Sequence, residues 1–101
     1  MVQYSGVERT FAALADPTRR AVVERLGNGS ASISELAAPF GISLTGMKKH
    51  VHVLEEAGLV VTRKVGRVRR CTLAPYAFEG ITTWLQRLDR FAEVVERTKG
   101  M

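Results

Sequence analysis

Two histidines and two lysines lie close together near the middle of the chain, in the segment SLTGMKKHVHVLEEAGLV of residues 43–60. Paired imidazoles can bind a metal ion, a single imidazole can act as a general base, and clustered positive charge can bind a polyanion. Each possibility makes a different demand on the neighbouring residues, so the sequence itself can distinguish them.

Helical geometry separates the two histidines. In a helix over residues 43–57, one arc of about 120° holds the apolar positions and one histidine: Met47, His50, Val51, Leu54 and Ala57. The opposite side holds Thr45, Lys48, Lys49 and His52, with Glu56 behind them. Since residues two apart on a helix point away from each other, His50 and His52 cannot chelate one ion. We therefore expect a core-edge His50, an exposed His52 and no metal site.

The outward side also lacks the partners that catalysis requires. A general base needs a nucleophile or an acid held nearby, whereas this side offers mostly cations. The chain has neither a phosphate-binding loop nor a nucleophile-base pair, and its one cysteine, Cys71, cannot complete a thiolate metal site. The sequence predicts that the protein is not an enzyme and uses no cofactor.

The positive charge is concentrated in the same region. The net charge of the 101 residues is +5. Residues 43–73 hold seven basic and two acidic side chains, and the remainder holds eight of each. The whole excess therefore lies in the central third, which favours a polyanion such as double-stranded DNA as a partner.

The outward side chains suit the edges of DNA bases. Lys48 and Lys49 can donate to guanine O6 and N7, the Thr45 hydroxyl and His52 ring can bond to bases or phosphates, and Leu44 can touch a thymine methyl. Gly46 permits close approach near the amino end of the helix, whose free amides attract phosphate. The predicted DNA-contacting residues are Ser43, Leu44, Thr45, Gly46, Lys48, Lys49, His52, Arg63, Arg67 and Arg69.

Capping residues mark the helices that precede this segment. A first helix is expected over residues 7–15 and a second from Pro17, with Asp16 as its N-cap and the glycines of residues 27–29 as its stop. The sequence SISE forms a capping box for a short third helix that ends by about Phe40. The fourth is capped by Ser43 and stops at Gly58.

A hairpin and a long helix follow. The alternating segment VVTRKVGRVRRCTL predicts two strands that turn at Gly66-Arg67 with Val65 opposite Val68, which places Val60, Thr62, Cys71 and Leu73 on one face. Some of the hairpin's basic side chains are expected to pair with Glu55 or Glu56. The last, amphipathic helix is expected to begin near Pro75.

The order α-α-α-α-β-β-α predicts a mainly helical, winged helix-turn-helix fold as a single domain over residues 1–101. Ala37 and Gly41 support the turn, because a small residue lets two helices approach and glycine tolerates the positive φ that the turn requires. The apolar residues of the first and last helices exceed the needs of a small core. We expect these helices to form a homodimer interface: Phe11, Leu14, Phe78, Ile81, Trp84, Leu85, Leu88 and Phe91.

Four segments resemble the arsenic-repressor (ArsR) family of bacterial winged-helix transcriptional regulators. LADPTRRAVVERL is similar to the family's opening helix, SISELAAPFGIS to its first motif helix, KKHVHVLEEAGLV to its recognition helix and GRVRRCTL to its wing. The resemblance implies a homodimer that binds a palindromic operator, usually as a repressor released by a signal.

The chain departs from the metal-sensing members of that family. Where they carry two cysteines in ELCVCDL, this sequence reads ELAAPFG, with Ala37 and Pro39 at the cysteine positions, and its last helix has no histidine. The resemblance is therefore to a subgroup that does not sense metals, and the small-molecule effector, if one exists, is unidentified.

Two alternatives to a sequence-specific repressor are open. A thiol-responsive regulator would act through Cys71, whose expected place on the inward face of the wing favours a buried structural thiol. The same fold can also serve as a protein-interaction module without DNA. No apolar run approaches a membrane span and the N-terminus lacks a signal peptide's pattern, so we expect a cytoplasmic protein without a membrane partner.

Overall fold

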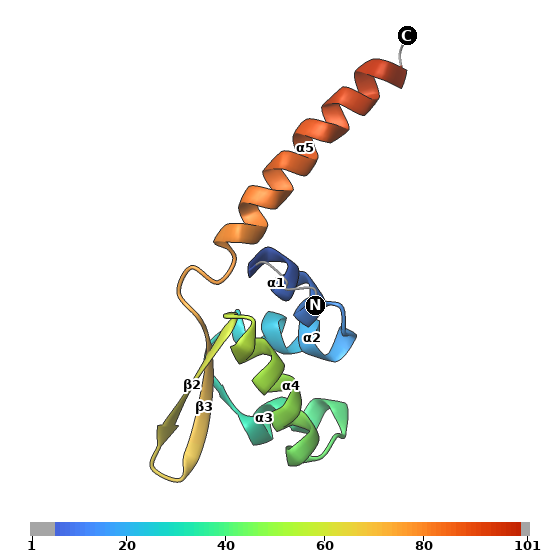
Figure 1. The fold of residues 1–101 in the computed structure, drawn as a ribbon. Helices are drawn as coiled ribbons and strands as arrows, with labels where there is room; N and C mark the ends of the chain where they lie inside the picture. The colour runs from blue at the N-terminus through green and yellow to red at the C-terminus, as the bar shows by residue number, and fades with distance from the viewer. Residues whose placement is uncertain (1–5, 100–101) are drawn as a thin grey trace, which may run out of the picture.

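The computed structural model describes the backbone of residues 6–99 and, apart from positions 6, 81, 84 and 99, their side chains. Within that range the chain forms five α-helices, one 3₁₀ turn and three strands (Figure 1). The elements are α1 (Gly6–Leu14), α2 (Pro17–Leu26), β1 (Ala31–Ser32), α3 (Ile33–Ala37), η1 (Ala38–Phe40), α4 (Leu44–Glu56), β2 (Val60–Val65), β3 (Val68–Leu73) and α5 (Glu79–Lys99). The predicted winged helix-turn-helix architecture is confirmed, with one short additional strand.

The helices begin where the predicted caps stand. The Asp16 carboxylate accepts a hydrogen bond from the Arg19 amide at 3.0 Å, and Pro17 occupies the first position of α2. The Ser32 hydroxyl accepts from the Glu35 amide at 3.1 Å at the start of α3, and the Ser43 hydroxyl accepts from the Gly46 amide at 3.0 Å at the start of α4. Each bond satisfies an amide that has no partner within the helix, so side chains in the sequence fix all three starts.

The turn between α3 and α4 has the predicted chemistry. Pro39 lies within the 3₁₀ turn η1, and Gly41 ends it with φ of 63°, in the left-handed region where glycine carries no Cβ penalty. Ala37 is buried where α3 packs against α4. The short turn therefore aims α4 across α3.

The sheet is antiparallel in the order β1-β3-β2. Val65 pairs with Val68 as predicted, so Gly66 and Arg67 form the tip of the hairpin. The additional strand β1 pairs Ala31 with Cys71 and Ser32 with Arg70. Two residues are too few to show an alternating pattern, which explains why this strand was not predicted.

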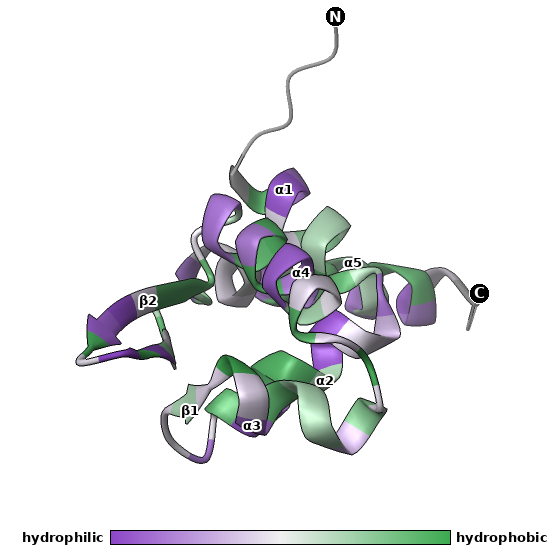
Figure 2. Ribbon diagram, turned by 90° about the horizontal axis from the view of Figure 1, so that it is seen from below, coloured by the Kyte–Doolittle hydropathy of each residue, from purple (hydrophilic) through white to green (hydrophobic). Residues whose placement is uncertain are grey.

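The core lies between the helices α2, α3 and α4 and the base of the hairpin. Its largest fully buried side chains are Leu36, Met47, Leu54, Leu59, Val22, Val51 and Cys71. In Figure 2 hydrophobic colour covers the base of β2 beside the helices, whereas hydrophilic colour appears toward its far end. The hairpin is therefore anchored at its base and projects its tip away from the core.

The start of the last helix differs from the prediction. Instead of near Pro75, α5 begins at Glu79, after turns in which the Ala77 amide donates to the Ala74 carbonyl at 3.1 Å. Tyr76 has φ of 61°, a left-handed conformation that interrupts any helix begun at Pro75. The first helix is likewise displaced by one residue, covering Gly6–Leu14 rather than residues 7–15.

α5 extends away from the rest of the molecule (Figure 1). Its first turn packs on α1, where a Cβ at Gly80 would lie 3.1 Å from Val7 Cγ2. The radius of gyration is 16.8 Å, compared with about 13 Å for a compact domain of this length. None of the helices in the described range has the length and apolarity to cross a membrane. Apart from its contact with α1, α5 projects away from the other elements in the described range.

Candidate nucleic-acid interface

Helix α4 buries one side and exposes the other, as its spacing predicts. Met47, Val51 and Leu54 are almost completely buried, whereas the outward side chains are exposed. These exposed side chains include Thr45, Lys48, Lys49 and His52. Packing on one side therefore determines which side of α4 can meet a ligand.

The two histidines have separate partners. His50 Nδ1 lies 3.4 Å from Arg19 Nη1, which can only donate, and 3.9 Å from Asp16 Oδ2. His52 Nε2 lies 3.4 Å from Glu56 Oε1. The His50 side chain is 27% exposed and that of His52 is 69% exposed. His50 is thus the core-edge residue at the α2–α4 junction and His52 the exposed one, as predicted.

Electrostatics at the α2 N-terminus agree with these contacts. The hydrogen bond from the Arg19 amide lowers the pKa of Asp16, and the charges of Arg19 and His50 lower it further. No three His, Cys, Asp or Glu side chains within the described residues are grouped as potential metal ligands.

Two adjoining grooves run along the outward side of α4. One, of about 650 Å³, is lined by Thr45, Lys48, Lys49, His52 and Arg69 among others. The second, of about 380 Å³, lies between α4, the start of α3 and the hairpin, and its polar lining includes Ser34, Lys48, Lys64, Arg67 and Arg69. Because both grooves are lined by Lys48 and Arg69, helix and hairpin form one continuous basic surface, which we call the basic groove.

The strand register distributes the wing cations over two faces. Lys64 is opposite Arg69 and Arg63 is opposite Arg70, and cross-strand partners share a face. Lys64 and Arg69 therefore face the basic groove, while Arg63 lies on the other face. The sequence prediction included Arg63 and omitted Lys64. Alternation counted back from the Val65–Val68 pair would have distinguished them.

Two arginines of the wing hold protein groups. Arg69 Nη1 donates to Thr62 Oγ1 at 3.2 Å, and Thr62 Oγ1 donates to Glu55 Oε2 at 3.1 Å. Arg70 pairs with Glu35 at 3.4 Å. Basic wing residues were expected to pair with Glu55 or Glu56, and Arg69 reaches Glu55 through Thr62. Glu56 lies beside His52 instead.

The residues predicted for the dimer interface divide into three groups. Phe11, Leu85, Leu88 and Phe91 are exposed large hydrophobic side chains. Leu14 and Phe78 pack partly against the core. The side chains of Ile81 and Trp84 lie outside the described part of the structure. Val94 and Val95 are also exposed and extend the apolar surface toward the end of α5.

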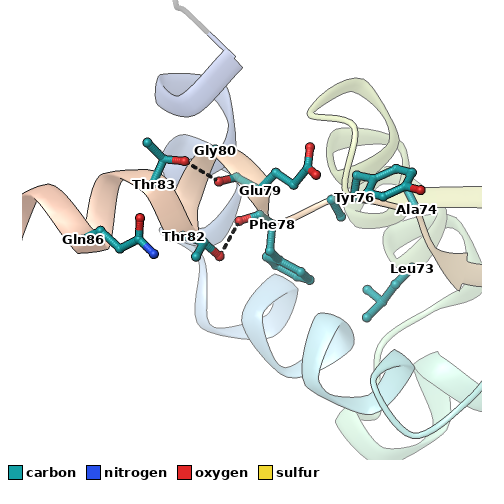
Figure 3. Close-up of a pocket in the computed structure, with 10 residues that line it drawn as sticks. Leu73, Ala74, Tyr76, Phe78, Glu79, Gly80, Thr82, Thr83 and Gln86 are labelled. Carbon is teal, nitrogen blue, oxygen red and sulfur yellow. Dashed lines mark hydrogen bonds between the residues drawn. The ribbon is translucent and has the colours of Figure 1, made fainter.

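A depression of about 680 Å³ lies where β3 passes into α5 (Figure 3). Its lining includes Leu73 and Phe78, and two threonine hydroxyls turn back to the helix backbone. Thr82 Oγ1 donates to the Phe78 carbonyl at 2.9 Å and Thr83 Oγ1 donates to the Glu79 carbonyl at 3.1 Å. It lies at the opposite end of the hairpin from the tip, so it is separate from the basic groove (Figure 1).

Cys71 lies on the inward face of β3 and is 0% exposed. Burial raises the pKa of its thiol, and the Glu55 carboxylate raises it further. A reactive cysteine is accessible and has a lowered pKa, so this environment is that of a structural thiol.

Comparisons with known proteins agree on the class of this domain. A family model described as a helix-turn-helix domain matches residues 14–63. The HTH-type transcriptional regulator Rv2034 of Mycobacterium tuberculosis is 35% identical over an alignment 101 residues long. The alignment covers 95% of this chain and 94% of that protein.

Solved structures show the same similarity. The crystal structure of the ArsR family transcriptional regulator RHA00566 superposes with a TM-score of 0.80 at 45% identity, covering 92% of this chain and 97% of that one. The homodimeric winged helix-turn-helix DNA-binding domain Mb0332 from Mycobacterium bovis superposes with a TM-score of 0.69 at 22% identity, covering 89% and 91%. At that identity the second comparison establishes the fold alone.

The Cys71 thiol is expected to be protected in the folded protein. Because it is buried and its raised pKa keeps it protonated at pH 8, alkylation by iodoacetamide should be roughly tenfold or more slower than in urea-unfolded protein. Mass spectrometry of timed samples measures both rates. Equal rates in the folded and unfolded states would contradict the structural role and favour a responsive thiol.

Proposed function

Because the chain belongs to the ArsR family of winged helix-turn-helix, DNA-binding transcriptional regulators, we propose that it represses transcription by binding a palindromic operator as a homodimer. Helix α4 enters the major groove, and the hairpin contacts the phosphate backbone or the minor groove. The observation that carries this proposal is the basic groove, where the outward side of α4 and the hairpin tip form one positive surface.

The amino-terminal half of α4 supplies the contacts that can read sequence. Lys48 and Lys49 are exposed ammonium donors for guanine O6 and N7, and Thr45 precedes them by one turn. Leu44 is half exposed at the first position of the helix, where it can reach a thymine methyl. His52 lies one turn further along, near the edge of the groove.

The start of α4 is also suited to a phosphate. Gly46 has no side chain, and its amide is held by the Ser43 hydroxyl. A helix N-terminus presents free amides and the positive end of the helix dipole, which favour an anion. Because the Gly46 amide is already bonded, Gly46 contributes only space for a phosphate, beside the Ser43 hydroxyl, and the lysines serve the bases.

The hairpin adds contacts that are independent of sequence. Arg67 at the tip, with Lys64 and Arg69 behind it, places three positive charges beside Lys48. Charges of this kind hold phosphates and release counterions, which supplies affinity and fixes the orientation of the protein. Arg63 lies on the other face, so we assign it a peripheral role at most.

The dimer follows from the uncovered apolar residues of α5 and α1. A symmetric pairing of these helices would bury the exposed side chains of Leu85, Leu88 and Phe91 and the exposed part of Phe11. Two copies of α4 would then lie about 34 Å apart, in successive major grooves of a palindromic site. A dimer bound over a promoter would exclude other proteins, which is the simplest route to repression.

The regulating signal is not a thiolate-bound metal on this proposal. Ala37 and Pro39 have no metal ligand in their side chains, and the Cys71 thiol is buried. The burial of Cys71 argues against the thiol-responsive alternative. The interaction module without DNA leaves the exposed lysines of α4 without a ligand. A regulator of chromosomal DNA acts in the bacterial cytoplasm, where we place this one.

The substitution Lys49→Ala, which removes an ammonium donor for the bases, is expected to weaken operator binding about tenfold with the fold retained. Arg67→Ala removes one phosphate contact, so it should weaken binding about equally for operator and non-operator DNA. It should also reduce the slope of log K against log salt by about one. Titration by fluorescence anisotropy at several salt concentrations measures both effects.

Arg90→Ala is the matched control, because it removes one positive charge from the exposed surface of α5, outside the basic groove. If Lys49→Ala and Arg67→Ala bound DNA as tightly as the Arg90→Ala control, the assignment of the basic groove would be wrong.

Placing a carboxylate on the apolar side of α5 is expected to separate the subunits. Leu88 is 44% exposed, and a Glu there would be desolvated in the proposed interface. Sedimentation at micromolar concentration should show a dimer for the wild type and mainly monomer for Leu88→Glu. Gln86→Glu introduces the same charge on the other side of the helix and should remain dimeric. A monomeric wild type would contradict the proposed interface.

A further inference from the structure

Glu35 joins three elements of the fold. It lies in the first turn of α3, where its amide donates to Ser32 Oγ. One carboxylate oxygen lies 3.7 Å from Arg25 Nη2 of α2, and the other lies 3.4 Å from Arg70 Nη1 of β3. Hydrogen bonds from the Ser32 hydroxyl and amide, together with the charges of Arg70 and Arg25, lower the pKa of Glu35. The carboxylate is therefore ionised at neutral pH.

Arg70 turns back toward the protein. Besides Glu35, its guanidinium donates from Nη2 to the Ser30 carbonyl at 3.2 Å and to Ser30 Oγ at 3.0 Å. Its backbone is paired with Ser32 of β1. All of these contacts lie on the side of the hairpin away from Lys64 and Arg69. Arg70 is thus one of the basic residues of the central region, yet it binds the protein instead of facing the basic groove.

The direction of the hairpin decides whether the basic groove exists. Lys64, Arg67 and Arg69 line it with Lys48 only while the hairpin tip stays close to α4 and the start of α3. The base of the hairpin is anchored in the core, and Thr62 of β2 bonds to Glu55 of α4. On the other edge of the sheet, the backbone connection to the helical body is β1, a strand of two residues. So short a backbone connection resists tilting of the hairpin weakly, and the Glu35–Arg70 contact lies beside it.

We propose that Glu35 is a positioning residue for DNA binding: through Arg70 it holds the hairpin at the angle at which the cations of the wing and α4 share one DNA-facing surface. The inference rests on the proposed function, since it concerns the same basic groove. On this proposal the Glu35 carboxylate favours DNA binding, although its negative charge alone would repel the DNA.

Glu35→Gln tests the proposal by the sign of its effect. Glutamine also serves at this position of a capping box, so α3 keeps its start while the charge is lost. If Glu35 acted only through long-range charge, its removal would tighten DNA binding. The proposal requires a loss of affinity of about two- to fivefold, the range expected for one partly exposed ion pair. Glu24→Gln removes the same charge from the exposed surface of α2 and should leave affinity equal or slightly higher.

The double variant assigns the effect to Arg70. With Arg70→Gln in the background, Glu35→Gln should cause no further loss of affinity, because the contact is already broken. Additive losses would overturn the route through Arg70. Affinity that is unchanged or tighter in Glu35→Gln alone would overturn the positioning role itself.

Wing mobility gives a readout without DNA. Backbone ¹⁵N relaxation of the free protein should show lower order parameters for Gly66 and Arg67 in Glu35→Gln than in the wild type, with those of α4 unchanged. Unchanged order parameters at the tip would overturn the proposal, whether or not the protein binds an operator. If Lys49→Ala bound DNA as tightly as the wild type while Glu35→Gln still showed the more mobile hairpin tip, the proposed function alone would be contradicted.

Discussion

The burial of one side of α4 is the constraint on which the rest of the structure depends. Met47, Val51 and Leu54 fill the space between α2, α3 and the base of the hairpin, and each contributes roughly 1.5–3 kcal/mol by leaving water. A rotation of α4 by one residue would bring polar side chains into that space. The rotation of the helix about its axis is therefore fixed by residues that touch no DNA, and Lys48 and Lys49 face outward as a consequence.

The hairpin and α5 extend this logic to the two proposed contacts of the protein. On the inward face of the hairpin, Val60 and Cys71 anchor the base in the core, while Lys64 and Arg69 continue the same face at the tip. Strand alternation thus connects core packing to the position of charge. At the other end, α5 leaves the helical body with exposed apolar side chains, which a second copy would cover in the proposed dimer. One end of the molecule suits a polyanion, and the other suits a second copy.

What the sequence could predict was encoded locally. Caps such as Ser32 and Ser43 act within three residues, and the Val65–Val68 pair follows from a two-residue turn. The starts of the three capped helices, the hairpin register and the buried side of α4 were therefore all accessible. Strand β1 and the pairing of Glu35 with Arg70 depend on which segments meet in three dimensions, and no local pattern carries them. The late start of α5 depends on the left-handed backbone conformation of Tyr76, which cannot be predicted from a tyrosine in the sequence. Strand alternation, which the site prediction did not follow along the hairpin, puts Lys64 on the face that lines the basic groove and Arg63 on the opposite face.

Selection of bound fragments from random double-stranded DNA tests the central claim most directly, because it requires recognition and symmetry together. The account predicts an enriched palindrome whose half-site centres lie about 10 base pairs apart, matching two copies of α4 in successive major grooves. A library that is not enriched in any sequence, or an enriched site without two-fold symmetry, would contradict a symmetric dimer that reads DNA through α4.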